Sequence, residues 1–364
     1  MSLRRTQAER PTPAGSPVRS RRWSQRRRLA GIGVLTATAL FATGCSISGS
    51  ASTSSSTPNS SSSSHGVTGS GSAAGSASGS PASPGAASAA AGAHGVGAPV
   101  VHPSCTRPPT TWKSFKAPDA VVPDLPELEA GTNHSKTADK WTYSASQVHQ
   151  WMAKPQTAPK GKKLVFITFD DGPDSTVTPK ELSNLEKAGV PATFFMITPQ
   201  LQGVPVDLLR RSLRDGNGLD IHSYSHDYKY LFHGDANQRA AHVTCDYDWA
   251  LAQARAVIGS DYDPSGFRYP GGEMSWNDLS KANAGLAKRG VVPIDWNAMS
   301  GDADAHMPTT IPGYVTMVKQ SIAESGNPRV VVILNHDIKE KTAEAMPSIL
   351  AWLKSQGYQF GIIS

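Results

Sequence analysis

The sequence from Lys163 onward predicts an α/β fold with a parallel β-sheet. Short apolar runs alternate there with longer stretches of helical character, and this alternation is typical of parallel β/α architecture, either covered on both faces or closed into a barrel. About seven strands in about two hundred residues favour a barrel, complete or incomplete. The hydrophobic content of 38% permits a core of enzyme size.

Each expected element has its own local pattern. Apolar runs predict strands at residues 164–169, 192–197, 219–223, 266–270, 291–296, 330–336 and 358–363. Mixed apolar and charged stretches predict helices at residues 178–189, 206–216, 235–259, 276–290, 311–326 and 342–357. The carboxyl ends of such strands converge on one mouth, where active-site residues collect in barrels of this type.

The first 45 residues have the three-part pattern of an export signal. An Arg-rich start is followed by an uncharged, mostly apolar run of sixteen residues at 29–44 and then by Cys45, and this run is short for a stable membrane span. The segment "FATGC" resembles a lipobox, so we expect cleavage before Cys45 and lipid attachment to it. An uncleaved signal-anchor helix is the alternative, and both Sec and twin-arginine export stay open.

The positive charge of the chain is concentrated in this first segment. Residues 1–28 hold nine Arg and one Glu, a net charge of +8, whereas the whole chain carries +6, so the remainder sums to −2. A nucleic-acid-binding protein needs a basic face. We therefore expect no nucleic-acid partner.

Residues 46–103 have the composition of a disordered linker. They are mainly Ser, Gly, Ala and Pro, without any Asp, Glu, Lys or Arg, and so cannot bury enough apolar surface to offset the loss of chain entropy. A flexible coil of this length spans on the order of 40 Å. Residues 104–160 are rich in Pro and poor in pattern, which predicts an N-terminal strap packed on the domain at 161–364.

Two further cysteines follow the linker. Cys105 and Cys245 are an even pair in a chain that we expect outside the cytoplasm, where thiols oxidise. They would be either joined as a disulfide or buried as two free thiols, because the sequence does not tell whether their Cα atoms approach to the required ~5–6 Å.

Acids, imidazoles and one guanidinium gather at the expected strand ends. "ITFDDGP" places Asp170 and Asp171 side by side after a buried strand, and two unpaired acids there would repel unless a cation held them. "HSYSH" places His222 and His226 four residues apart, which suits binding of one ion. With one carboxylate they would form a two-His, one-carboxylate face that leaves positions open for water and substrate.

Taken in order, the motifs "TFDDGP", "HSYSH", "RYPGG" and "ILNH" resemble those of the polysaccharide deacetylases, carbohydrate esterase family four, also called the NodB-homology domain. The resemblance covers residues 163–364. It implies a distorted (β/α)7 barrel that holds one divalent metal ion, usually Zn²⁺, with Co²⁺ or another divalent ion as the alternative. The implied reaction is hydrolysis of acetyl groups on a polymeric sugar.

The resemblance also implies a role for each matched residue. Asp170 would be the general base, Arg268 would orient it, and His336 would be the general acid. The backbone N–H of Gly271 would complete an oxyanion site. Amide hydrolysis needs these functions, because water must be activated, negative charge stabilised and the departing amine protonated. The implied metal ligands are Asp171, His222 and His226.

The sequence departs from the family pattern at two points. Gly271 stands where the family usually has Tyr, and Trp276 is a candidate to replace the missing ring. The acid that supports the catalytic His normally lies in an Asp-Trp pair. We prefer Asp302 for this role because of its distance beyond the expected strand, and Asp295, which lies within the apolar run, is the alternative.

The predicted function is metal-dependent hydrolysis of N-acetyl groups on a cell-wall polysaccharide, most plausibly the N-acetylglucosamine units of peptidoglycan or a chitin-like polymer. A linker of this reach would carry the domain from a membrane anchor into the wall. Two alternatives are a non-catalytic glycan-binding surface lipoprotein and an O-acetyl xylan esterase on the same scaffold. We expect an exported monomer whose partners are the glycan and the membrane.

Overall fold

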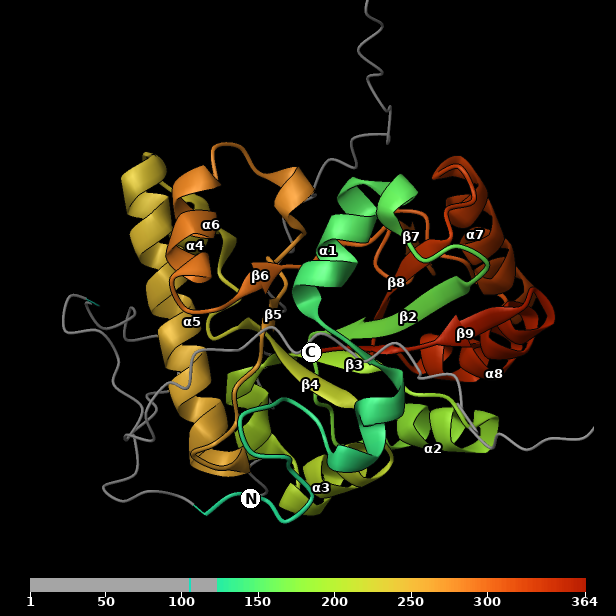
Figure 1. Ribbon diagram of the computed structural model, residues 1–364, viewed down its shortest axis with the longest axis horizontal. Coiled ribbons are helices and arrows are strands. Elements are labelled where there is room, and N and C mark those ends of the chain that lie inside the picture. Colours follow the sequence, from blue (N-terminus) through green and yellow to red (C-terminus); the bar gives the residue numbers. More distant parts are fainter. Residues whose placement is uncertain (1–104, 106–122) are drawn as a thin grey trace, which may run out of the picture. The chain divides into compact units, whose positions relative to one another are not determined.

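The structure, a computed structural model, describes Cys105 and residues 123–364 (Figure 1). The expected export signal, Cys45, the linker at 46–103 and residues 106–122 of the strap lie outside the described residues. Within the described part of the chain, no helix has both the length and the apolar character needed to cross a membrane.

One parallel sheet forms the centre of the fold. Its strands follow the order β6-β5-β4-β3-β2-β8-β7, and β9 pairs with the first half of β2. Every pairing is parallel, and β2 pairs with β8 over its whole apolar run, from Leu164 to Asp170. The strands are β2 (Lys163–Asp170), β3 (Thr193–Ile197), β4 (Gly218–Ser223), β5 (Gly266–Phe267), β6 (Val292–Pro293), β7 (Ala298–Met299), β8 (Val330–His336) and β9 (Tyr358–Phe360).

The barrel is incomplete between β6 and β7. The chain crosses from one edge of the sheet to the other within four residues, because Ile294 N donates to Phe267 O beside β5 and Asn297 N donates to Val332 O of β8. The expected strand at 291–296 is therefore wrong in its extent, since β6 ends at Pro293. Asp295 lies in the crossing segment and not within a strand, because the backbone turns there to reach the other edge.

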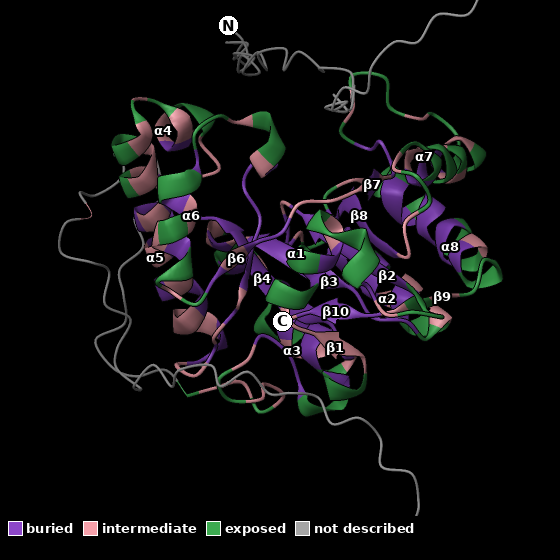
Figure 2. Ribbon diagram, turned by 45° about the horizontal axis from the view of Figure 1, so that its top comes forward, coloured by how far each residue is buried: buried purple, intermediate pink, exposed green. Residues whose placement is uncertain are grey.

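Helices pack around the sheet, and Figure 2 shows that they carry both buried and exposed residues. The six expected helices are α2 (Thr178–Ala188), α3 (Val206–Arg214), α5 (Ala236–Ile258), α6 (Ser280–Ala287), α7 (Ile311–Glu324) and α8 (Glu340–Ser355). The expected last strand at 358–363 is divided into β9 and β10 (Ile362–Ile363), and β10 pairs with β1 (Thr142–Tyr143) of the strap. The distorted, incomplete (β/α)7 barrel that was expected is thus confirmed.

The alternation of side chains along β2 separates two parts of the core. Val165, Ile167 and Phe169 belong to the large apolar cluster between sheet and helices. Leu164 and Phe166 point to the other face, since neighbouring strand residues alternate, and pack in a second cluster. Thr168 and Asp170 continue this second face toward the carboxyl end of the strand. Because side chains alternate between the two faces, Asp170 points to the inside of the barrel.

The described part of the strap packs against that inner cluster. Helix α1 (Ala145–Ala153) begins at Ser144, whose hydroxyl accepts a hydrogen bond from Gln147 N, and it contributes Ala145, Val148 and Trp151 to the cluster that contains Phe166. The strap is also tied to α5 by a disulfide between Cys105 and Cys245, whose Cα atoms are 5.3 Å apart. Of the two arrangements left open for these cysteines, the structure has the bonded one.

Candidate active site

The two adjacent acids at the end of β2 have different surroundings. Asp170 is 2% exposed, and its Oδ1 accepts a hydrogen bond of 2.7 Å from Arg268 Nη1. Asp171 has a φ of 73°, in the left-handed region, and a cis peptide bond between Gly172 and Pro173 follows it. Because Asp171 has this left-handed backbone conformation, both carboxylates lie at the same mouth although strand neighbours normally face opposite sides.

Arg268, at the end of β5, is completely buried. Its guanidinium donates to Thr168 Oγ1 at 2.7 Å and to Ile294 O at 2.9 Å, in addition to the bond to Asp170. It also lies over the ring of Phe195, 4.1 Å from the ring centroid. The fixed geometry of these donors holds the Asp170 carboxylate in one orientation.

The two histidines of "HSYSH" turn one nitrogen each toward Asp171. His222 Nδ1 donates to the carbonyl oxygen of Arg268 at 2.7 Å, which places the proton on Nδ1 and leaves the lone pair of Nε2 free. The distances to Asp171 Oδ1 are 3.5 Å from His222 Nε2 and 3.2 Å from His226 Nε2. His226 reaches this position with a φ of 49°.

Asp246 on α5 fixes the loop that carries the histidines. Its carboxylate accepts hydrogen bonds from Ser223 Oγ, Tyr224 N and Ser225 N at 2.7–2.8 Å. Ser223 Oγ in turn accepts from His226 N at 2.8 Å. Asp246 is fully buried, and sequence reasoning missed it, because an Asp inside a long helical pattern carries no signal that it faces a loop.

The Asp171, His222 and His226 group fits one divalent ion. The three ligand atoms lie within 4.8 Å of one another, and Asp171 Oδ1 is buried without a hydrogen-bond partner among the described residues. A buried oxygen without a donor is costly, and a cation between the three atoms would satisfy it. Two imidazoles and one carboxylate are a donor set that suits Zn²⁺ and leaves open positions.

The charge states of Asp171 and His226 agree with this arrangement. Burial opposes ionisation of Asp171, but the neighbouring imidazoles of His222, His226 and His336 hold its pKa well below the ordinary value. Burial, aided by the proximity of His222, lowers the pKa of His226 to about 4. At neutral pH the group therefore offers an ionised carboxylate and a neutral His226, the forms that bind metals.

A second group of potential ligands lies in the strap, away from these motifs. It consists of Glu129, His134 and Asp139. His134 Nε2 already pairs with Asp139 Oδ1 at 3.3 Å, and its Nδ1 lies 3.0 Å from both Asn133 Oδ1 and Ser364 Oγ. These contacts connect the strap with the end of the chain.

His336, the last residue of β8, is paired with Asp302. Its Nδ1 donates to Asp302 Oδ1 at 2.8 Å, and its backbone N–H donates to Asp302 Oδ2 at 2.8 Å. Thr342 Oγ1 also donates to Oδ2, at 2.7 Å. His336 Nε2 lies 4.0 Å from Asp171 Oδ2, so the ring faces the same mouth as the metal-ligand group.

Asp295, the other acid considered for this pairing, faces a different partner. Its Oδ1 accepts from Glu273 N at 2.8 Å and its Oδ2 from Met274 N at 3.1 Å. These bonds hold the loop after Gly271.

Trp276 stacks on Phe232 with ring centroids 3.8 Å apart, and its centroid lies 5.4 Å from that of Tyr228, two residues after His226.

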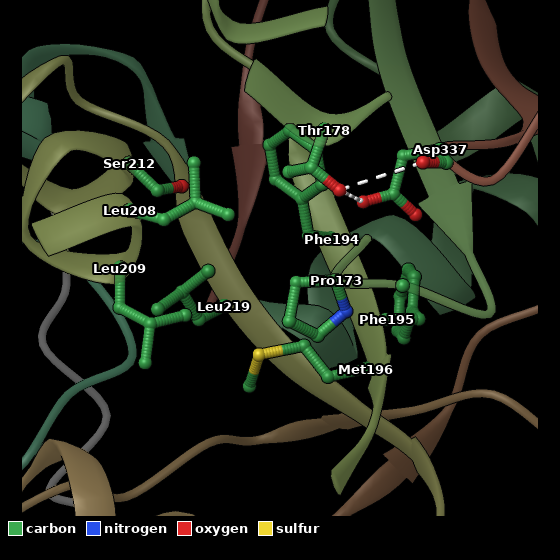
Figure 3. A pocket seen from close by; sticks show the side chains of 11 residues that line it. Pro173, Thr178, Phe194, Phe195, Met196, Leu208, Leu209, Ser212, Leu219 and Asp337 are labelled. Atoms are coloured by element: carbon green, nitrogen blue, oxygen red, sulfur yellow. Dashed lines mark hydrogen bonds between the residues drawn. The ribbon is translucent and has the colours of Figure 1, made fainter. Parts of the chain in front are cut away.

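A small, mainly apolar cavity lies behind the mouth, beside Pro173 (Figure 3). Thr178 Oγ1 donates to Asp337 Oδ2 at 2.5 Å at one side of this cavity. The Asp337 carboxylate lies so close to Gly172 that a Cβ there would be 2.1 Å from Oδ2. This contact explains why the residue after the two acids must be Gly.

Comparisons with known proteins agree with the motifs. A family model described as polysaccharide deacetylase matches residues 157–288. A CE4 esterase from Streptococcus mutans has a similar solved structure, with a TM-score of 0.58, 35% identity, and coverage of 65% of this chain and 98% of its own. A peptidoglycan-N-acetylglucosamine deacetylase from Bacillus cereus is 31% identical over 57% of this chain and 89% of its own length.

Other relatives are much longer than the matched region. A bifunctional xylanase/deacetylase from Pseudobutyrivibrio xylanivorans is 31% identical over 57% of this chain, but the match spans only 31% of that protein. The chain therefore belongs to the polysaccharide deacetylase family.

Proposed function

We propose that this protein removes N-acetyl groups from a cell-wall polysaccharide, namely from the N-acetylglucosamine units of peptidoglycan, with one bound divalent ion. The observation that carries the proposal is the difference between the two adjacent acids. Asp171 Oδ1 has two imidazole nitrogens within 3.5 Å and no hydrogen-bond donor among the described residues. Asp170, by contrast, is held by Arg268.

In this proposal, Asp171, His222 and His226 hold the ion, and Zn²⁺ fits this donor set. A divalent ion in such a site supplies Lewis-acid activation of water and of the acetyl carbonyl. Asp170 accepts the proton of the attacking water. Its Oδ1 is occupied by Arg268, but its Oδ2 faces the ligand group, 3.9 Å from His222 Nε2.

His336 would protonate the departing amine. Burial disfavours its charged form, but the hydrogen bond and charge of Asp302, with Asp170 and Asp171 nearby, raise the pKa of His336 to about 9. The imidazolium is therefore the main form at neutral pH. Since Asp302 occupies Nδ1, the Nε2–H is the proton directed toward the mouth.

The location of the reaction is also part of the proposal. The relative from Bacillus cereus is named for peptidoglycan N-acetylglucosamine, and the start of this chain has the pattern of an export signal. We place the enzyme at the outer face of the membrane, attached through Cys45, with the linker at 46–103 extending the barrel into the wall.

Acetate release from N-acetylated peptidoglycan by the purified full chain tests the proposal. We expect activity that a chelator abolishes, that Zn²⁺ or Co²⁺ restores, and that Asp170→Asn lowers by at least about a hundredfold. Asp207→Asn, at an acid whose side chain is 81% exposed, is the matched control and should have wild-type activity.

Three outcomes would count against it. Metal-loaded protein that releases no acetate from any acetylated polymer would support the glycan-binding alternative. Faster release from O-acetylated xylan than from peptidoglycan would support the xylan esterase. Full activity of Asp170→Asn would contradict the role of this residue as the base.

A further inference from the structure

The loop after Pro270 carries the candidate oxyanion donor, and nearly all of its backbone groups are already paired. The carbonyl oxygens of Tyr269, Pro270 and Gly271 accept from Gly272 N, Trp276 Nε1 and Ser275 Oγ at 2.6–2.8 Å. The next two carbonyls, of Gly272 and Glu273, accept from Ser275 N and Trp276 N at 3.1 Å.

One backbone N–H group of this loop, that of Gly271, has no acceptor among the described residues. Pro270 has no N–H, and Gly272 N is paired with Tyr269 O. The N–H groups of Glu273 and Met274 donate to Asp295. No acceptor among the described residues pairs with Gly271 N–H. Gly271 is partly exposed, so this N–H can donate to a group bound at the mouth.

The backbone conformation of this loop requires an external restraint. Gly271 and Gly272 have φ values of 76° and 79°, a region that favours glycine, and two consecutive glycines cost more entropy to order than other residues. A Cβ on Gly272 would lie 2.7 Å from the ring of Trp296. The two glycines alone do not fix the conformation of this loop, so contacts with other parts of the chain must do so.

Asp295 provides that restraint from the end of β6, the strand that pairs with β5. It follows β6, and its backbone carbonyl accepts a hydrogen bond of 3.5 Å from Arg268 Nη2, while its carboxylate binds the two N–H groups that follow Gly272. The same residue thus contacts both the arginine that holds Asp170 and the loop that carries Gly271.

We propose that Asp295 is a positioning residue that fixes the Gly271 N–H where the oxyanion forms during acetyl transfer to water. This inference rests on the proposed deacetylase function. Asp295 itself touches no reacting atom. Its two charge-assisted hydrogen bonds hold the loop rigid before the substrate binds, so no reorganisation is needed when negative charge develops.

The first test is Asp295→Asn in the full chain. The amide keeps one acceptor but directs an NH₂ group at the second N–H, so the loop shifts. Loss of an oxyanion donor lowers kcat by about 10²–10³-fold, and for a displaced donor we expect about ten- to a hundredfold. KM should stay within about twofold, since the oxyanion forms only after binding. The metal content and the pH profile should also be unchanged.

Asp235→Asn is the matched control. Asp235 caps α5 and also accepts from two backbone N–H groups, but through Oδ1 alone, from Asn237 N at 2.7 Å and from Gln238 N at 3.0 Å. Its replacement removes the charge from a carboxylate that binds two backbone N–H groups, while Asn still caps the helix, so kcat should stay at the wild-type value. Equal kcat for the two variants, or a loss in Asp295→Asn that is entirely in KM, would overturn the inference.

A second variant tests the same contact from the donor side. Glu273→Pro removes one of the two N–H groups, and Pro is tolerated there because Glu273 is the first residue of a 3-10 helix and Gly272 has a ψ of 145°. We expect kcat to fall in this variant and the effects of the two substitutions to be less than additive in the double variant. Full additivity would overturn the inference, whereas a wild-type chain without any acetate release would instead refute the proposed function.

Discussion

Replacement of Asp302 by Asn should move the alkaline limit of the reaction to lower pH. Asp302 is 2% exposed, and its carboxylate accepts from His336 Nδ1 at 2.8 Å. The charge and this hydrogen bond help to raise the pKa of His336 to about 9. Because the general acid must be protonated, the wild-type rate should fall as the pH rises through about 9.

The size of the shift follows from the lost contact. A hydrogen bond to a charged group contributes about 1.5–3 kcal/mol, and one pKa unit corresponds to about 1.4 kcal/mol. The alkaline limit should therefore move down by about one to two pH units in Asp302→Asn. The Asn side chain retains an acceptor for Nδ1, so the ring should keep its orientation and some activity should remain at pH 6.

The assay is the pH dependence of kcat for acetate release between pH 5 and 10. Asp248→Asn is the control, because it removes a carboxylate charge that pairs with Arg289, at 2.6 Å, and not with His336. This variant should keep the wild-type profile. An alkaline limit that stays in place in Asp302→Asn would refute the assignment of His336 and Asp302 as the acid and its support.

Three further predictions concern stability. Glu181 is fully buried, and burial raises its pKa to about 8. The folded state therefore keeps a proton that the unfolded state loses above about pH 4.5, so the stability of the protein falls as the pH rises from about 4.5 to about 8. Glu181→Gln should raise the free energy of urea unfolding by about 3 kcal/mol at pH 7 but little at pH 4. Arg268→Lys should lower that free energy by about 3–5 kcal/mol and also lower kcat, because one ammonium cannot replace the donors that hold Asp170; unchanged urea midpoints would contradict this. Cys105→Ser should cost up to about 5 kcal/mol, since the disulfide joins residues 140 positions apart, and acetate release from the folded variant should stay at the wild-type level.

The elements with a strong local pattern were predictable from the sequence. The apolar run at 164–169 lies within β2, seven of whose eight residues are buried, and the helical pattern at 235–259 corresponds to α5 almost without change. The period of two along β2 also places Asp170 at the mouth. Contacts between residues that are far apart in the sequence, in contrast, cannot be predicted from the pattern of one short segment.

Asp295 and Asp246 illustrate what local patterns cannot predict. Asp295 lies within the apolar run at 291–296 and is therefore predicted to be in a strand, but the backbone turns after Pro293, and its carboxylate binds the loop after Gly272. Asp246 binds a loop about twenty residues earlier from inside a helix. The pairing of Asp302 with His336 has the geometry expected for the preferred alternative, while the catalytic roles stay predictions.

The most direct test of the account is the metal content of four forms of the full chain after equilibration with Zn²⁺ and removal of free ion. Wild-type protein and Asp170→Asn should retain the same amount, because Asp170 is held by Arg268 and is not among the ligands. Asp171→Ala and His226→Ala should each retain one ion fewer per chain. Equal metal content in all four forms would contradict the claim that Asp171, His222 and His226 hold the catalytic ion.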